Sequence, residues 1–173
     1  MEWDDKITVK KANVGEKIID DLIRANGRSI SYAPITDGGH PFDRLIASKD
    51  KKHIQIAEVK ALDKRRYYDD TGISIKHYKG YKHISDKYGM KVFIFFVDGS
   101  LSEIYGNFLD KLEVEYIDEK KNKKYPLIES NKKAIGREII YFPMANMKRN
   151  LYRLSGSQVE ELKELTEYYG LTT

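Results

Sequence analysis

The pattern of hydrophobic and polar positions predicts a helix near the start of the chain. From Val14 to Arg24 the apolar residues, placed at about 100° per residue, form one continuous face, and Asn26-Gly27 provides a helix stop. Stretches rich in turn residues at 36–39 and 48–52 then separate three extended segments, which are Arg28–Ala33, Phe42–Ala47 and His53–Ala61.

A second helix is predicted from about Ser74 to Tyr88. Apolar and aromatic side chains recur there at helical spacing, at Ile75, Tyr78, Tyr81, Ile84 and Tyr88. The uninterrupted apolar run Lys91–Val97 that follows is typical of a central strand covered on both faces.

The C-terminal part is less regular. The charged stretch Asp118–Lys124 indicates a loop or hairpin tip, and Glu138–Phe142 is a short strand candidate. Ser157-Gln158-Val159-Glu160 matches a capping box, which predicts a terminal helix.

The order of these elements is typical of an α/β fold, a sandwich of helices around a mixed sheet. A chain of 173 residues fits one domain, and we expect the core at about 14–97 with a C-terminal elaboration at about 98–173.

Composition limits the class of protein. Hydrophobic residues make up 40% and charged residues 34%, so the chain should fold rather than be disordered. The absence of cysteine excludes disulfides and cysteine-rich zinc sites. The acidic start and the lack of a long apolar run predict a cytoplasmic protein with no membrane partner.

The net charge of +4 favours a polyanionic partner such as nucleic acid, because lysine and arginine neutralise phosphates. The alternative is that the excess of lysine serves solubility alone.

Two charged residues interrupt the apolar strand His53–Ala61. Side chains alternate along a strand, so Glu58 and Lys60 share a face with Ile54 and Ile56, where charges are unexpected unless they serve a function. If the preceding strand pairs with this one as a hairpin, Asp43 can lie beside Glu58.

Two adjacent carboxylates repel each other unless a cation lies between them, and oxygen ligands suit Mg²⁺ or Mn²⁺. Such an ion can polarise a phosphoryl oxygen and lower the pKa of bound water, while a neighbouring lysine orients that water or stabilises negative charge. This combination fits phosphodiester hydrolysis. The alternative is an ordinary surface pair with Asp43 as a turn residue.

Pro41-Phe42-Asp43 followed by Glu58-Val59-Lys60 resembles the PD-(D/E)xK nuclease superfamily, with Gly15-Glu16 where many members carry a helical glutamate. The resemblance spans roughly 14–97 and implies a restriction-endonuclease-like α/β/α sandwich with a mixed sheet of about four strands. It also implies that Asp43 and Glu58 bind Mg²⁺ or Mn²⁺, that Lys60 positions the attacking water, and that Glu16 is an auxiliary ligand.

The helical pattern places Glu16 at the edge of the apolar face, whereas Lys17, Asp20 and Asp21 fall on the polar side. Glu16 is therefore the acidic residue of this helix best placed to reach inward. A solvated glutamate in the first turn is the alternative interpretation.

The sequence departs from the superfamily pattern in two places. Phe42 separates proline from aspartate, a variant of resolvase-like members. Where some exonuclease members carry glutamine and tyrosine, this chain has His77 and Tyr81, to which we assign a minor role at the substrate.

Basic residues directly after Lys60 are the strongest candidates for nucleic-acid contact, because they alternate with aromatics that can stack on bases. They are Lys64, Arg65 and Arg66, next to Tyr67 and Tyr68. A solvated loop would show the same composition.

The sequence therefore predicts a metal-dependent nuclease acting on DNA, with RNA a weaker candidate. Endonuclease, exonuclease and Holliday-junction cleavage all remain open, and a homodimer is plausible for cutting two strands. The alternative is a non-catalytic domain that binds nucleic acid or protein and retains the fold.

Overall fold

The computed structural model describes residues 7–32, 42–131 and 137–167. The first helix, α1 (Ile7–Ala25), confirms the predicted helix and begins before Val14. Its end is followed by Gly27, whose positive φ of 69° suits glycine. The turn predicted at 36–39, together with His40 and Pro41, lies outside the described residues.

Within the described residues, six strands form the main sheet, in the order β1-β2-β3-β5-β6-β11. β1 (Ser29–Tyr32), β2 (Arg44–Ala47) and β3 (Ile54–Lys60) form an antiparallel meander. β5 (Val92–Asp98) pairs in parallel with β3, after the crossover through α2 (Ile75–Tyr88). β6 (Glu103–Phe108) and β11 (Lys148–Arg153) extend the sheet in antiparallel fashion.

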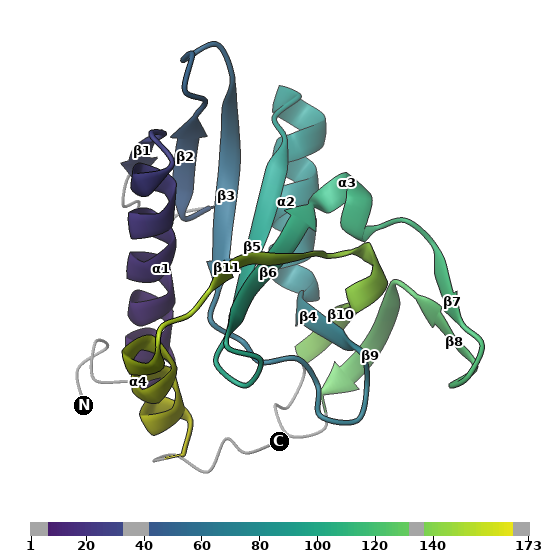
Figure 1. Ribbon diagram of the computed structural model, residues 1–173. Coiled ribbons are helices and arrows are strands. Elements are labelled where there is room, and N and C mark those ends of the chain that lie inside the picture. The colour runs from purple at the N-terminus through teal and green to yellow at the C-terminus, as the bar shows by residue number, and fades with distance from the viewer. Residues whose placement is uncertain (1–6, 33–41, 132–136, 168–173) are drawn as a thin grey trace.

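A second sheet and a hairpin lie beside the main sheet (Figure 1). The second sheet has the order β4-β10-β9, formed by β4 (Asp70–Ser74), β10 (Arg137–Pro143) and β9 (Leu127–Asn131). The hairpin consists of β7 (Tyr116–Asp118) and β8 (Lys123–Tyr125), which confirms the predicted hairpin tip. The remaining elements are the short helices α3 (Leu109–Leu112) and η2 (Met144–Asn146), and the terminal helix α4 (Gly156–Glu167).

Both faces of the main sheet are covered, as the apolar run in β5 predicted. Alternate residues of β5 enter two cores, with Ile94 and Phe96 in one and Phe93 and Phe95 in the other. The first core packs against α2 and β10, and the second packs against α1 and α4 (Figure 1). The expected α/β sandwich around a mixed sheet is confirmed, with six strands rather than about four in the described sheet.

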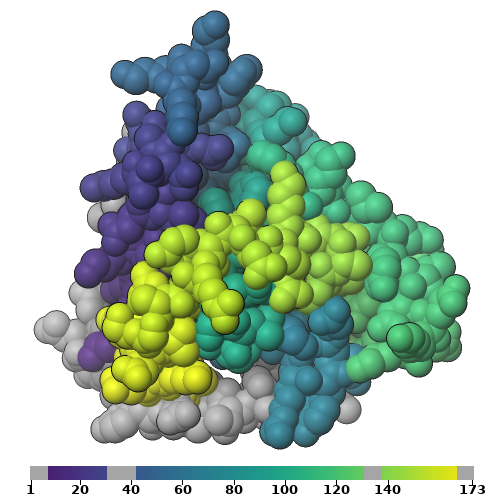
Figure 2. Space-filling view, viewed as in Figure 1, coloured from purple at the N-terminus to yellow at the C-terminus, as the bar shows by residue number. Residues whose placement is uncertain are grey.

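Figure 2 shows the face on which α1, β11 and α4 lie side by side, with the green region that contains the β7–β8 hairpin on the opposite side of the view from α1. No helix in the described ranges is long and apolar enough to cross a membrane.

Two predicted details are wrong. The capping box of α4 lies two residues earlier than expected, because the Ser155 hydroxyl accepts from the Gln158 N–H at 3.3 Å while Gln158 Oε1 accepts from the Ser155 N–H at 2.9 Å. Tyr88 does not belong to the buried stripe of α2, since its side chain is 61% exposed at the last turn of the helix.

The approach of α1 to the sheet depends on a glycine. A Cβ built on Gly15 would lie 2.9 Å from the Cβ of Ala61, the residue that follows β3. The missing side chain therefore lets the helix lie close to the end of this strand, which places Glu16 near Arg44.

Candidate active site

The pairing of β2 with β3 brings the two predicted carboxylates together. Arg44 is the register partner of Ala57, so Asp43 directly precedes the paired segment and lies beside Glu58. Asp43 Oδ2 accepts a hydrogen bond of 2.8 Å from the backbone N–H of Val59. The hairpin geometry that the sequence suggested for Asp43 and Glu58 is therefore present.

Lys60 completes this group. Its ammonium forms an ion pair and a short hydrogen bond with Glu58 Oε1. Glu58 is only 4% exposed, and among the described residues no donor makes a well-formed hydrogen bond to its second, buried oxygen, Oε2, although the Tyr81 hydroxyl lies within reach of this carboxylate. A buried carboxylate oxygen without a partner is costly, so this atom marks a position where a cation or water would be stabilising.

The environment of Asp43 makes its negative charge less favourable than it is in water. Burial raises the pKa of the Asp43 carboxyl above its usual value, and the negative charge of Glu58 raises it further. The Val59 N–H and the positive charges of Lys60 and Arg44 oppose this shift without cancelling it. Two carboxylates that destabilise each other's charge are suited to share a cation.

Tyr81 lies next to this carboxylate pair. Burial raises the pKa of its hydroxyl, and the negative charges of Glu58 and Asp43 add to the increase. Tyr81 is 3% exposed, so its ring is not accessible for stacking on a nucleic-acid base, and its assigned role at the substrate stays a prediction. His77, one turn earlier, is exposed, and its ring centroid lies 6.3 Å from that of Tyr81.

Glu16 faces an arginine that sequence reasoning missed. Arg44 Nη2 binds Glu16 Oε2 at 2.8 Å, while Arg44 Nε binds Asp20 Oδ1 at 2.8 Å. Asp20 is 8% exposed, so its predicted place on the polar side of the helix is wrong. The same guanidinium donates to the backbone carbonyl of Asp43 at 3.1 Å, which links α1 to the start of β2.

The donors present fit Mg²⁺ or Mn²⁺. Mg²⁺ keeps several waters and is often held by one or two carboxylates, a number that Asp43 and Glu58 supply. In the described part of the chain, no three histidine or acidic side chains are grouped so as to hold a metal. Glu16 is engaged by Arg44 instead, and its role as an auxiliary ligand stays a prediction.

The basic segment after β3 divides into two kinds of residue. Arg65 makes a bidentate ion pair with buried Asp70, binds Glu129 at 2.6 Å and lies over the ring of Tyr141. Its guanidinium therefore holds β4 and β9 together, a structural role that the sequence did not reveal. Arg66 and Tyr67 are exposed and remain candidates for substrate contact, and Lys64 is half-buried beside Asp69.

The fold and site together define an α/β protein with a paired carboxylate and lysine at the end of a central strand. No protein-family model matches the chain, and neither does any curated protein sequence.

Solved structures similar to this chain include the Holliday junction resolvase Hjc from the archaeal hyperthermophile Archaeoglobus fulgidus. It has 9% identity and a TM-score of 0.49, over 78% of this chain and 89% of that chain. A nuclease from a fusselovirus is similar at 12% identity with a TM-score of 0.44, over 90% of this chain and 89% of that one.

Proposed function

We propose that this protein is a divalent-metal-dependent nuclease that hydrolyses phosphodiester bonds in DNA. One observation carries the proposal: Asp43 and Glu58 lie side by side at the end of β3, with Lys60 bound to Glu58 and Glu58 Oε2 buried without a partner. Most buried polar atoms in proteins have a hydrogen-bond partner, and at Glu58 the unsatisfied oxygen lies beside a second carboxylate and a lysine, a combination that suits a bound cation.

Asp43 and Glu58 would hold the cation. When bound, Mg²⁺ or Mn²⁺ supplies Lewis-acid stabilisation of the charge that develops on the phosphoryl group, and it makes water a better nucleophile. The cation would also remove the repulsion that raises the pKa of Asp43.

Lys60 would act on the reacting atoms. Its ammonium, held by Glu58, can donate a hydrogen bond to the attacking water or to a non-bridging phosphate oxygen. Hydrolysis adds water across one P–O bond, which leaves a phosphate monoester on one fragment and a hydroxyl on the other.

Tyr81 and Arg44 would position these groups. Tyr81 is buried next to the carboxylate pair and would help to exclude bulk water from it. Arg44 fixes the backbone of Asp43 relative to α1. The exposed Arg66 and Tyr67, on the segment that leaves β3, would contact the DNA backbone and bases.

The test is a cleavage assay with Mg²⁺ or Mn²⁺ on linear, circular, single-stranded and four-way-junction DNA, with an RNA duplex as comparison. The purified protein is compared with Glu58→Ala and Lys60→Ala, and with Glu115→Ala as a control for an exposed glutamate. Metal-dependent cleavage that both site variants lose and the control keeps supports the proposal. The preferred substrate then distinguishes junction cleavage from general endonuclease or exonuclease activity.

Absence of cleavage of every substrate, together with absence of metal binding by calorimetry, would instead favour the non-catalytic binding domain. Under that alternative, Glu58→Ala and Lys60→Ala leave nucleic-acid affinity unchanged.

A further inference from the structure

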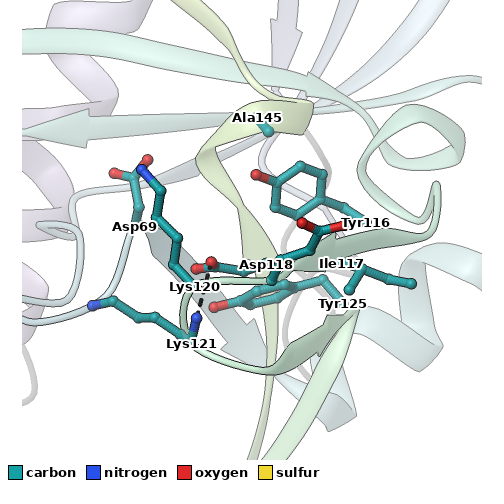
Figure 3. A pocket seen from close by; sticks show the side chains of 9 residues that line it. Asp69, Tyr116, Ile117, Asp118, Lys120, Lys121, Tyr125 and Ala145 are labelled. Atoms are coloured by element: carbon teal, nitrogen blue, oxygen red, sulfur yellow. Dashed lines mark hydrogen bonds between the residues drawn. The ribbon is translucent and has the colours of Figure 1, made fainter.

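A cavity of about 500 Å³ lies at the base of the β7–β8 hairpin, and the proposed reaction does not use it (Figure 3). Tyr116, Ile117 and Tyr125 provide apolar surface, with Ala145 of η2 on another side. Three carboxylates and two lysines also line the cavity, namely Asp69, Asp118, Glu119, Lys120 and Lys121.

The hairpin is fastened to the segment that leaves the candidate active site. Lys121 Nζ donates to the backbone carbonyl of Tyr67, and Lys121 and Lys123 lie 5.0 and 4.0 Å from the ring centroid of Tyr68. The chain therefore runs from Lys60 directly to one wall of the cavity. DNA that contacts Arg66 and Tyr67 would reach the hairpin next.

The cavity combines the groups that recognise a nucleotide. Tyr116 and Ile117 are 38% and 57% exposed, an unusual amount of apolar surface beside an open cavity, and aromatic rings stack on bases of any sequence.

The lysines at the cavity differ from their neighbours in the hairpin. Lys123 and Lys124 are paired with Glu129 and Glu115, whereas within the described residues no carboxylate forms an ion pair with Lys120 or Lys121. The exposed Lys120 ammonium is therefore available for phosphate, and the Lys121 ammonium, which uses one of its three N–H donors on the Tyr67 carbonyl, keeps the others for the same purpose.

The carboxylates indicate which form of nucleic acid enters. A duplex backbone would bring several phosphates against Asp69, Asp118 and Glu119, which repel them. A single unpaired base instead presents amino groups that carboxylates accept from, as in their pairing with the N4 amino group of cytosine. The mixture of charges therefore favours one unstacked nucleotide over a double helix.

Resting on the proposed nuclease function, we infer that the cavity under the β7–β8 hairpin binds an unpaired nucleotide of the DNA substrate, beyond the bond that is cut. The base stacks on Tyr116 and its phosphate meets Lys120 and Lys121. The substrate is accordingly a duplex that carries a single-stranded segment, rather than a blunt duplex.

The experiment measures fluorescence anisotropy in EDTA, which prevents cleavage, with a labelled duplex bearing a single-stranded cytosine tail and a blunt duplex of the same sequence. The variants are Tyr116→Ala and the double variant Lys120→Ala/Lys121→Ala. Their matched controls are Tyr152→Ala, a tyrosine 40% exposed on β11, and Lys49→Ala/Lys52→Ala at the β2–β3 turn. Tyr116→Trp tests whether stacking alone restores binding.

We expect Tyr116→Ala to bind the tailed duplex about tenfold or more weakly, with little change on the blunt duplex. The lysine double variant should weaken tailed binding and reduce its salt dependence, while Tyr116→Trp and the controls resemble the wild type. Equal affinity of the wild type for both duplexes, or unchanged tailed binding in Tyr116→Ala, overturns the inference.

The nuclease proposal and the nucleotide-site proposal can be overturned independently of each other. If tailed binding depends on Tyr116 but no metal-dependent cleavage occurs, the nucleotide site stands and the nuclease proposal is overturned. If cleavage depends on Glu58 while Tyr116→Ala binds both duplexes as the wild type does, the nuclease stands and the nucleotide site is overturned.

Discussion

Asp43 Oδ2 accepts a hydrogen bond of 2.8 Å from the backbone N–H of Val59, the residue between the two charged side chains at the end of β3. This bond holds the Asp43 carboxylate beside Glu58, although the two negative charges repel each other. A backbone donor thus maintains an arrangement that side-chain electrostatics alone would open. The arrangement lowers the stability of the metal-free protein, and this loss of stability can be measured.

Asp43→Asn is expected to stabilise the metal-free protein at neutral pH. The folded-state pKa of Asp43 is raised by burial and by Glu58, so the folded protein holds this proton more tightly than the unfolded chain. The free energy of unfolding therefore falls as the pH rises from the ordinary pKa of aspartate through the raised pKa of Asp43 in the folded protein. Asparagine keeps an acceptor for the Val59 N–H and removes the charge.

Thermal unfolding in EDTA measures this effect, with a rise in Tm of about 2–4 °C expected for each kcal/mol gained. The difference between wild type and Asp43→Asn should vanish below the ordinary pKa of aspartate, where both side chains are neutral. A wild type more stable than the variant at pH 7 in EDTA would contradict the assignment.

Mn²⁺ or Mg²⁺ is expected to raise the Tm of the wild type and not that of Glu58→Gln. A ligand at about ten times its Kd stabilises the folded state by about 1.4 kcal/mol. Glu115→Gln, a change at an exposed carboxylate, serves as the control and should retain the full shift. An equal shift in all three proteins would place the metal elsewhere.

Lys60→Met is expected to lower kcat by about 10²–10⁴ while the metal-induced rise in Tm persists, because lysine acts on the reacting atoms and not on the cation. Methionine has a similar length and lacks the charge. Single-turnover cleavage beside thermal unfolding separates the two effects. Loss of metal binding together with activity would show that Lys60 maintains the position of Glu58.

Arg44→Met is expected to destabilise the fold by about 3–5 kcal/mol, because it removes the ion pair that the guanidinium makes with the buried Asp20 carboxylate. Denaturant unfolding measures the loss. Adding Asp20→Asn to this variant should recover part of it, since the buried negative charge is removed. A double variant no more stable than Arg44→Met would show that the charge of Asp20 does not cause the stability loss in Arg44→Met.

The sequence was informative at the candidate site for a specific reason. Glu58 and Lys60 interrupt a strand whose other residues, apart from Gln55, are apolar, and such an interruption is visible without a structure. Arg44 gave no comparable signal, because an arginine at a strand start is ordinary on a surface. Its partners are distant in sequence, so a helical pattern alone placed Asp20 in solvent.

The N-terminal half of the fold was predicted well, apart from β4, because its other elements have clear periodicity. β6 and β11 were missed, although both belong to the main sheet. The segment Glu103–Phe108 mixes two polar residues and a glycine with apolar ones and shows no clear period, yet all but its last residue are buried. β11 is mostly exposed and carries three basic residues, so its place in the sheet comes from backbone pairing with β6 rather than from apolar burial.

Gly15→Ala and Gly80→Ala form a matched pair of helical substitutions. A methyl group at Gly80 meets nothing within 4 Å, so that variant should gain about 0.5–1 kcal/mol from helix propensity. At Gly15 the same methyl group would lie 2.9 Å from Ala61 Cβ, and overpacking of about 1–3 kcal/mol should exceed the gain. Changes in the free energy of unfolding, relative to the wild type, that have opposite signs in the two variants would confirm the close approach.

The contact between Gly15 and Ala61 also limits how this protein can diverge. The residue allowed at one of these positions depends on the residue at the other. The combined volume of the two side chains is what is limited, because together they set how closely α1 lies against the end of β3. In related chains we expect the two residues to vary together, so that alanine at the helix position accompanies glycine at the strand position. A search that scores this pair jointly with the Asp43, Glu58 and Lys60 positions should find relatives that overall identity does not.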